Sequence, residues 1–205
     1  MRKPRIIAAF AYRYEPDWLI DDLRENLSWV DGFAELDDRD RSDLWGERGD
    51  RTQRLMRIAM AMEPDWIFYT APDERLEDRA ATVLRRLAER GRHDRYSVRL
   101  REMWTPDSYR VDGVWGGKRR GRFFRAGTKS PRHRVDLNLY HLKMIEPANR
   151  AERARVHTLA NTWDNRGRGF DYMLDERGLR LEQIPEGRGF SPPYRPYRFD
   201  VQGNG

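Results

Sequence analysis

The sequence predicts an α/β fold with an open, twisted and mostly parallel sheet and helices on its flanks. Two observations support this class. Short apolar runs bounded by charged residues recur through the first ninety residues, and amphipathic helical segments separate them. Such alternation requires parallel strands joined by right-handed crossovers. The 205 residues suffice for one domain of this kind, with or without an extension.

The first strand–helix–strand unit is predicted from hydrophobic patterning. The apolar run 5–12 ends in charged residues and is typical of a strand buried on both faces. Apolar residues then recur at helical spacing over 19–30, and Gly32 ends this helix. Residues 33–36 form the second predicted strand, which runs directly into the acidic segment 37–43.

The next unit repeats the pattern. A helix begins at the capping box of residues 50–53, and the third buried strand is 66–69. This strand opens into the segment 71–74, after which apolar positions over 80–88 predict a strongly amphipathic helix. Gly91 is the expected stop of that helix.

The second half of the chain changes character. Three more strands and one helix are predicted there: 96–103, 121–125, 135–142 and 147–163. From Gly187 onward Gly, Pro, Arg and Tyr dominate, which indicates an extended tail. We therefore expect a domain over residues 1–165 and a C-terminal extension over residues 166–205.

Composition excludes several classes of function. The chain has no cysteine, hence no disulfide frame and no thiol nucleophile. No apolar window approaches ~20 residues, and the first apolar run stops at Arg13, so we expect a cytoplasmic protein without a membrane span or signal peptide. The motifs of P-loop enzymes, ordinary dinucleotide sites, serine hydrolases and zincins are absent. The formal charge of +6 permits nucleic-acid binding, but 40 basic residues interleave with 34 acidic ones, so the sequence shows no long stripe of positive charge for a nucleic acid to follow.

Two acidic segments mark the expected site. Open α/β sheets bind ligands beyond the carboxyl ends of their strands, and Asp37 and Asp73 both follow such ends. Asp73 and Glu74 suit Mg²⁺ or Mn²⁺, and His141 is the one histidine that follows an apolar strand. Simpler roles also fit: the acidic pair as a helix cap, the histidine as a satisfied structural side chain, and residues 37–40 as a solvated turn.

These segments together resemble family 2 glycosyltransferases of the GT-A fold. The most specific stretch is 64–76, which is similar to the family's D-W-x-x-x-x-D-A-D-E-R-L segment. Residues 36–43 resemble its D-D-x-S-x-D run, 118–125 its basic strand, and 139–143 its histidine segment. The resemblance covers roughly residues 5–163 and implies a GT-A-like sheet.

One position departs from the family pattern. Ala71 stands where the family's D-x-D motif begins, so the metal role passes to Asp73 together with His141. Loss of the first carboxylate keeps a second interpretation open, a GT-A-like binding protein without turnover. A basic nucleic-acid binder is the third interpretation.

The resemblance implies transfer of a sugar from a UDP- or GDP-sugar to a hydroxyl acceptor, with inversion and with Mn²⁺ or Mg²⁺ as cofactor. The acceptor is expected to be soluble, for example a protein. Ends of the first two strands would contact the nucleotide, with Asp38 on the ribose or base, and arginines would contact the diphosphate. The predicted donor-binding residues are Ala9, Phe10, Ala11, Arg13, Asp37, Asp38, Arg54, Ala71, Arg122 and Arg125.

An inverting transfer also needs a carboxylate that deprotonates the acceptor. Candidates lie between the metal motif and the basic strand: Glu102 and Asp112, with Asp107 behind them. Glu102 ranks first because a strand end positions it, and Asp112 lies beside a Gly-rich loop. In the tail, alternating Arg and Tyr residues from Arg188 to Arg198 suggest a lid over the donor phosphates or, equally, a segment that docks elsewhere.

Overall fold

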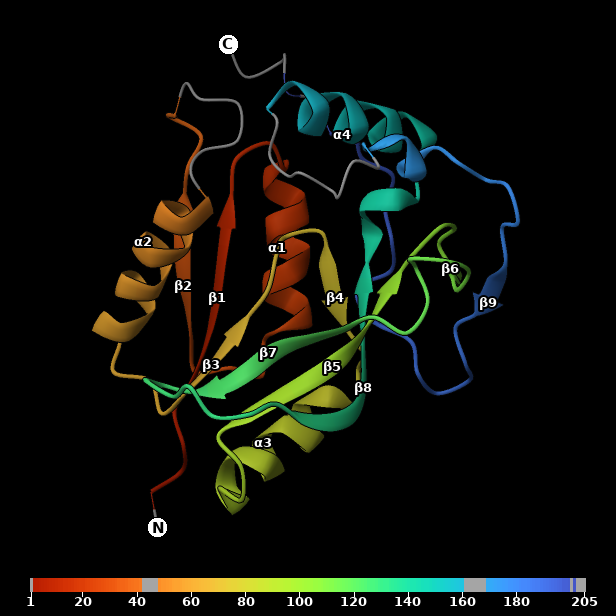
Figure 1. Cartoon of the computed structure of the whole chain (residues 1–205). Coiled ribbons are helices and arrows are strands. Elements are labelled where there is room, and N and C mark those ends of the chain that lie inside the picture. Colours follow the sequence, from red (N-terminus) through yellow and green to blue (C-terminus); the bar gives the residue numbers. More distant parts are fainter. Residues whose placement is uncertain (1, 42–47, 161–168, 200, 202–205) are drawn as a thin grey trace.

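The computed structural model describes residues 2–41, 48–160, 169–199 and 201. Seven strands form one sheet in the order β2-β1-β3-β7-β5-β8-β4 (Figure 1). Their bounds are Ile6–Tyr12 (β1), Gly32–Asp37 (β2), Trp66–Tyr69 (β3), Glu74–Leu76 (β4), Arg95–Glu102 (β5), Arg119–Arg125 (β7) and His133–His141 (β8). A second, two-stranded sheet joins β6 (Ser108–Arg110) to β9 (Leu181–Gln183) in antiparallel register.

The predicted fold class is confirmed. β1 pairs in parallel with β2 and with β3, and β5 pairs in parallel with β8. β7 lies antiparallel between β3 and β5, so five strands of the main sheet run one way and only β7 and β4 run the other. The result is an open, mostly parallel sheet, consistent with a GT-A-like arrangement.

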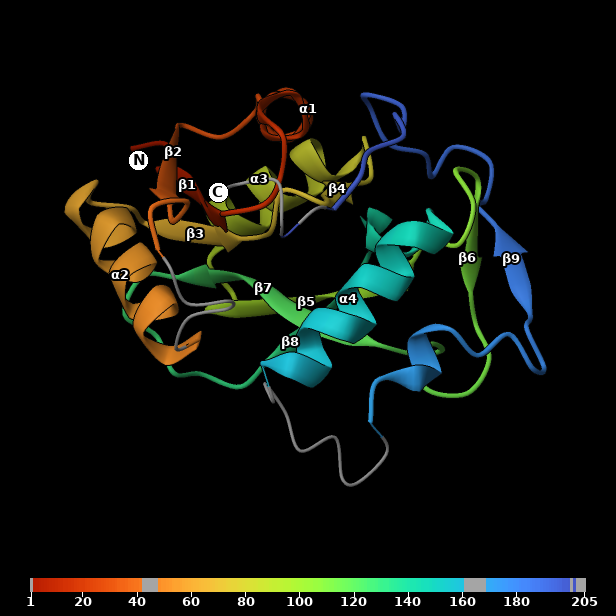
Figure 2. The same cartoon turned by 90° about the horizontal axis from the view of Figure 1, so that it is seen from above.

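Helices cover both faces of the sheet, as Figure 2 shows from above. α1 (Asp17–Asn26) and α3 (Ala80–Arg90) bury their apolar stripes in one core with alternate side chains of the strands. α2 (Arg48–Ala61) packs Leu55 and Ala59 on the opposite face, against β1, β2 and β3. The two faces explain why β1 is an unbroken apolar run, since both sides of that strand are buried.

Local signals set most element boundaries. α1 begins after Pro16, whose backbone is extended and therefore lies outside the helix. α3 ends at Gly91, which adopts the left-handed conformation at φ 58°. The helix expected over 147–163 is α4 (Pro147–Leu159); its predicted last turn reaches residues outside those described. Ser42 and Asp43 of the predicted acidic segment also lie outside the described residues.

Three short strands were not predicted, namely β4, β6 and β9. Each has only three residues, too few for an alternation pattern to emerge. The short turn η1 (Leu142–Met144) lies between β8 and α4. After α4, the described part of the C-terminal segment contains the turn η2 (Asp171–Met173) and then β9, and it continues without regular structure. Its aromatic residues pack on the domain: Phe170, Phe190, Tyr194, Tyr197 and Phe199.

Candidate functional site

A pocket of about 690 Å³ opens at the edge of the sheet where the parallel strands end. Side chains just beyond β1, β3, β5 and β8 meet there. Seven lysine and arginine side chains line it against four carboxylates. The charged lining consists of Arg13, Arg51, Lys118, Arg120, Arg122, Lys143 and Arg153, with Glu15, Asp73, Glu74 and Glu102. Such an excess of positive charge favours an anionic ligand.

Asp73 and His141 meet inside this pocket. The short strand β4 pairs antiparallel with β8, which sets Glu74 opposite His141 and brings Asp73 beside the imidazole. The Leu142 amide donates a 2.8 Å hydrogen bond to the Asp73 carbonyl and fixes this junction. Asp73 Oδ1 lies 3.4 Å from His141 Nε2. The predicted pair is therefore brought together although 68 positions separate its members in the sequence.

Arg153 of α4 completes the surroundings of Asp73. Its guanidinium donates a 2.8 Å hydrogen bond to Asp73 Oδ2, and both side chains are nearly fully buried. Burial alone would raise the pKa of Asp73, but the charges of His141 and Arg153 outweigh it and hold that pKa below its usual range. Asp73 is therefore ionised at neutral pH.

Glu102 faces the other side of the same imidazole. Parallel pairing of β5 and β8 sets Glu102 opposite His141, with Oε2 2.9 Å from Nδ1. Lys118 approaches Glu102 Oε1 at 3.3 Å, and Lys143 approaches Oε2 at 3.9 Å. Burial opposes ionisation of Glu102, yet the charges of Lys143 and His141 lower its pKa well below the ordinary value. Burial would also lower the pKa of His141, but Glu102 and Asp73 raise it.

The residues present fit a divalent cation of the predicted type. With ligand bonds of about 2.0–2.2 Å, two neighbouring ligand atoms lie roughly 3 Å apart, and the 3.4 Å between Asp73 Oδ1 and His141 Nε2 is close to this separation. Glu102 at Nδ1 matches the carboxylate that commonly orients a ligating histidine. No group of three or more ligating side chains occurs in the described part of the chain, so phosphate oxygens or water would complete the shell.

Asp38 lies at the end of β2 in a different environment. Its carboxylate is buried and faces three guanidinium groups: Arg13 at 2.7 Å, Arg54 at 2.8 Å and Arg51 at 3.3 Å. These arginines contact both of its oxygens, and Asp38 does not line the pocket; its contact with ribose or base stays a prediction. Arg13 and Arg51 reach the pocket in its place.

Some of the other predicted donor-binding and catalytic residues line the pocket, and the rest lie elsewhere in the fold. Ala11, Ala71 and Arg122 line the pocket, and Arg122 pairs with Glu74 and lies over the Tyr69 ring. The remainder lie away from the pocket lining. Ala9 and Phe10 are core residues of β1, Asp37 is exposed, Arg54 holds Asp38, Arg125 pairs with Asp94, and Asp112 pairs with Arg110.

Asp112, the second residue predicted as the base, is engaged by other groups of the protein. Both of its oxygens accept hydrogen bonds from Arg110, and the Arg180 amide adds a third. The hydrogen bonds from Arg110 lower the pKa of Asp112 to about 2. Its carboxylate therefore fastens the β6 region to the C-terminal segment.

Several pocket residues had no sequence signal that we used. Arg153 and Lys143 were not among the predicted site residues, although Lys143 belongs to the histidine segment 139–143, and Phe199 lies in the predicted tail. The signal available was weak: Arg150 and Arg153 are spaced to share one face of α4, and both are buried. Phe199 reaches the pocket because Asn149, fully buried, bonds to the backbone of Tyr197 and of Phe199.

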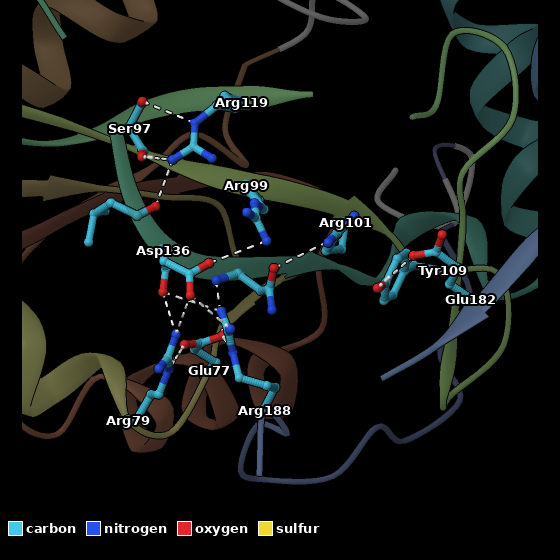
Figure 3. Close-up of polar contacts among 12 residues, drawn as sticks. Glu77, Arg79, Ser97, Arg99, Arg101, Tyr109, Arg119, Asp136, Glu182 and Arg188 are labelled. Carbon is cyan, nitrogen blue, oxygen red and sulfur yellow. Dashed lines mark hydrogen bonds and ion pairs between the residues drawn. The ribbon is translucent and has the colours of Figure 1, made fainter. Parts of the chain in front are cut away.

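Most of the tail docks elsewhere. Arg188 pairs with Glu77 and Asp136 beside β8 (Figure 3). Arg195 pairs with Asp22 of α1, and the Tyr194 hydroxyl donates to Glu146. Of the two alternatives left open for the tail, these residues follow the second, docking away from the pocket. Among the described residues from 187 onward, only Phe199 lines the pocket.

Comparisons with known proteins do not assign a family. No family model matches the chain, and no curated protein does. Among solved structures, A197 from STIV shares 12% identity at a TM-score of 0.40, covering 67% of this chain and 85% of A197. Residues 1–349 of S. aureus TarS share 9% identity at a TM-score of 0.42, covering 84% of this chain and 70% of that chain. Likenesses this distant do not establish a shared function.

No helix in the described ranges combines the length and the apolar character needed to cross a bilayer.

Proposed function

We propose that this protein transfers a glycosyl group from a UDP- or GDP-sugar to a hydroxyl acceptor, with inversion, and that Asp73 and His141 hold the Mn²⁺ or Mg²⁺ on which transfer depends. The observation that carries the proposal is the approach of Asp73 Oδ1 to His141 Nε2 in a pocket with a surplus of cationic side chains. The GT-A-like sheet and the resemblance of residues 64–76 to family 2 glycosyltransferases support it.

The chemical demand is to stabilise the diphosphate as it departs. A bound divalent cation supplies part of this stabilisation by neutralising the growing negative charge. Arg122, Arg153 and Lys118 bind the phosphate oxygens and supply the rest, since all three line the pocket. Arg13 and Arg51 extend the positive surface towards the end of β1, where the nucleotide is expected.

Glu102 is assigned the task of orienting His141. With its carboxylate at Nδ1, the imidazole proton stays on that side and Nε2 remains directed at Asp73. Two lysines near Glu102 and its lowered pKa weaken it as a proton acceptor. Deprotonation of the acceptor, the role predicted from the sequence, is thus the second possibility for Glu102. The two roles predict different effects of a Glu102 substitution on metal-linked binding and on kcat.

A binding protein without turnover is the alternative function, and Ala71 favours it. Its amide donates to Glu74 Oε2, and its methyl group offers no ligand where the related motif has a carboxylate. Both functions require metal-linked nucleotide binding, so turnover is the property that separates them.

Calorimetry with UDP and GDP, each with and without Mn²⁺, tests the proposal. Wild type and Asp112→Asn should bind at least one nucleotide more tightly with Mn²⁺, and Asp73→Asn should lose that difference. Asp112→Asn is the matched control because its carboxylate also pairs with an arginine, away from the pocket. Equal affinity with and without Mn²⁺ in wild type would overturn the metal role. Metal-linked binding without slow hydrolysis of any UDP- or GDP-sugar, even with a panel of acceptors, would favour the alternative.

A further inference from the structure

A second hollow, of about 290 Å³, lies at the opposite edge of the sheet, where β5 and β8 begin. β5 has eight residues, so about 25 Å of strand separates this edge from the pocket at the carboxyl ends. Its lining comes from the end of α3, the loop after it and the first residues of β5 and β8. The lining residues are Leu87, Arg90, Arg92, His93, Tyr96, His133 and Arg134.

The charges of this hollow are all of one sign. Arg90, Arg92 and Arg134 line it, no carboxylate does, and none of the three has a polar partner among the described residues. Of the carboxylates close to it in sequence, Asp94 pairs with Arg125 and Asp136 pairs with three other arginines, while Glu89 is exposed and does not line the hollow. All three arginines are exposed to solvent, and a bound anion would offset their like charges.

The neighbouring face of the same strands shows the contrast (Figure 3). There Arg79, Arg99 and Arg188 all pair with Asp136, and Arg119 bonds to backbone carbonyls. Arginines on that face neutralise or satisfy groups of the protein itself. Those of the hollow pair with no carboxylate of the residues that the structure describes.

Donors other than arginine converge on the same hollow. Gly91 turns the chain at φ 58°, and the imidazole of His93 then stacks on that of His133, with centroids 3.4 Å apart and planes inclined by 13°. Tyr96, 3% exposed, contributes a buried hydroxyl that lies beside the backbone of His93 and has no side-chain partner in the described part of the chain. Guanidinium, imidazole and hydroxyl groups are the donors that bind phosphate.

We propose that this hollow is a second binding site, for a phosphate monoester group, and that it is separate from the nucleotide pocket. Its size suits one phosphate with the atoms next to it, carried by a soluble metabolite or by a lipid headgroup. The proposal does not depend on glycosyl transfer, because none of its residues lines the pocket at Asp73.

The four histidines of the chain allow each site to be followed separately. His93 and His133 line the hollow, whereas His141 and His157 line the nucleotide pocket. With histidine selectively labelled, NMR titration with inorganic phosphate at fixed pH, and with ionic strength held constant by chloride, should shift the His93 and His133 signals to saturation. Arg92→Ala with Arg134→Ala should weaken this binding about tenfold or more.

Two further variants separate a built site from general attraction. Arg57→Ala removes the same charge from the exposed side of α2 and should leave the phosphate affinity unchanged. Tyr96→Phe removes only the buried hydroxyl and should weaken binding a few-fold. The proposal is overturned if chloride alone reproduces the shifts of His93 and His133, or if Arg57→Ala weakens binding as much as the double variant.

Vesicles then identify the source of the phosphate. Cosedimentation with phosphatidylcholine vesicles that contain phosphatidic acid, lost in the variant that lacks Arg92 and Arg134, would assign the site to a lipid headgroup. Saturable binding of inorganic phosphate without cosedimentation would assign it to a soluble phosphate monoester.

Discussion

Asp38 and Asp73 are both buried carboxylates near the carboxyl edge of one parallel sheet, and both pair with arginine, yet their surroundings differ. Asp38 faces three guanidinium groups, which together occupy both oxygens. Asp73 faces one arginine at Oδ2, while Oδ1 is directed at an imidazole in an open pocket. Both oxygens of Asp38 are therefore engaged by arginines. In Asp73, one oxygen lies beside His141, whose imidazole can also ligate a metal ion.

The comparison teaches that an acidic residue at a strand end is not by itself a site. Asp38 joins the end of β1 to α2 through Arg13 and Arg54, so its charge is used for the fold. Asp73 is held by backbone pairing of β4 with β8, which leaves its side chain available. The predictions below test this division between a structural and a functional carboxylate.

The largest expected effect is on stability, from Asp38→Asn. Arg13, whose side chain is 4% exposed, would lose the buried carboxylate that it shares with Arg51 and Arg54, and breaking such a pair costs about 3–5 kcal/mol. Urea unfolding should show this loss, while the folded variant keeps metal-linked nucleotide binding. Asp37→Asn, the exposed neighbour, is the control and should change stability by less than about 0.5 kcal/mol. Loss of metal-linked binding in Asp38→Asn with unchanged stability would contradict a structural role for Asp38.

Acid should remove the same stabilisation from wild type. Burial would raise the pKa of Asp38, but hydrogen bonding and charge from Arg13 hold it below its usual value. A lowered folded-state pKa gives stability that is fully present above the unfolded pKa of about 3.9 and is lost as the pH falls through the folded value. The difference in unfolding free energy between wild type and Asp38→Asn should therefore be constant near neutrality and shrink below about pH 4. A difference that persists undiminished to about pH 2 would contradict this origin.

Glu102→Gln sharpens the functional side of the comparison. If Glu102 orients His141, the variant should weaken Mn²⁺-linked nucleotide binding about 10- to 100-fold, as loss of a carboxylate behind a ligating histidine typically does. If Glu102 is instead the base, kcat should fall about 10²- to 10⁴-fold while Mn²⁺-linked binding stays as in wild type. Glu182→Gln, which removes a carboxylate bonded to Tyr109 outside the pocket, should change neither quantity.

The smallest effect is expected from Phe199→Leu. The Phe199 ring lies 4.0 Å from the Arg153 guanidinium and packs edge-on against Tyr14. Leucine keeps the apolar bulk but removes the ring face, at a cost of roughly 0.5–2 kcal/mol in such contacts. Nucleotide affinity measured by calorimetry should fall a few-fold to about 30-fold through looser placement of Arg153 beside Asp73. Unchanged affinity would show that the tail end does not position Arg153.

The long elements could be predicted because their signals are local. The apolar run of β1, the helical spacing in α1 and α3 and the stop at Gly91 need only nearby residues, and the structure agrees with them to within a few positions. Alternation of these elements was enough for the α/β class. The short strand β4 was missed, and with it the register that sets Glu74 opposite His141.

The sequence by itself determined which residue types stand at strand ends, because apolar runs and their charged borders are written along the chain. Tertiary structure alone decided which of those charges face one another. Asp38 is saturated by arginines brought from β1 and α2, whereas Asp73 meets Arg153, 80 positions away, and the ring of His141. The partner of a carboxylate is set by distance in space, because the electrostatic interaction energy falls as the distance between charges grows. Contacts of this kind leave no periodic pattern in the sequence.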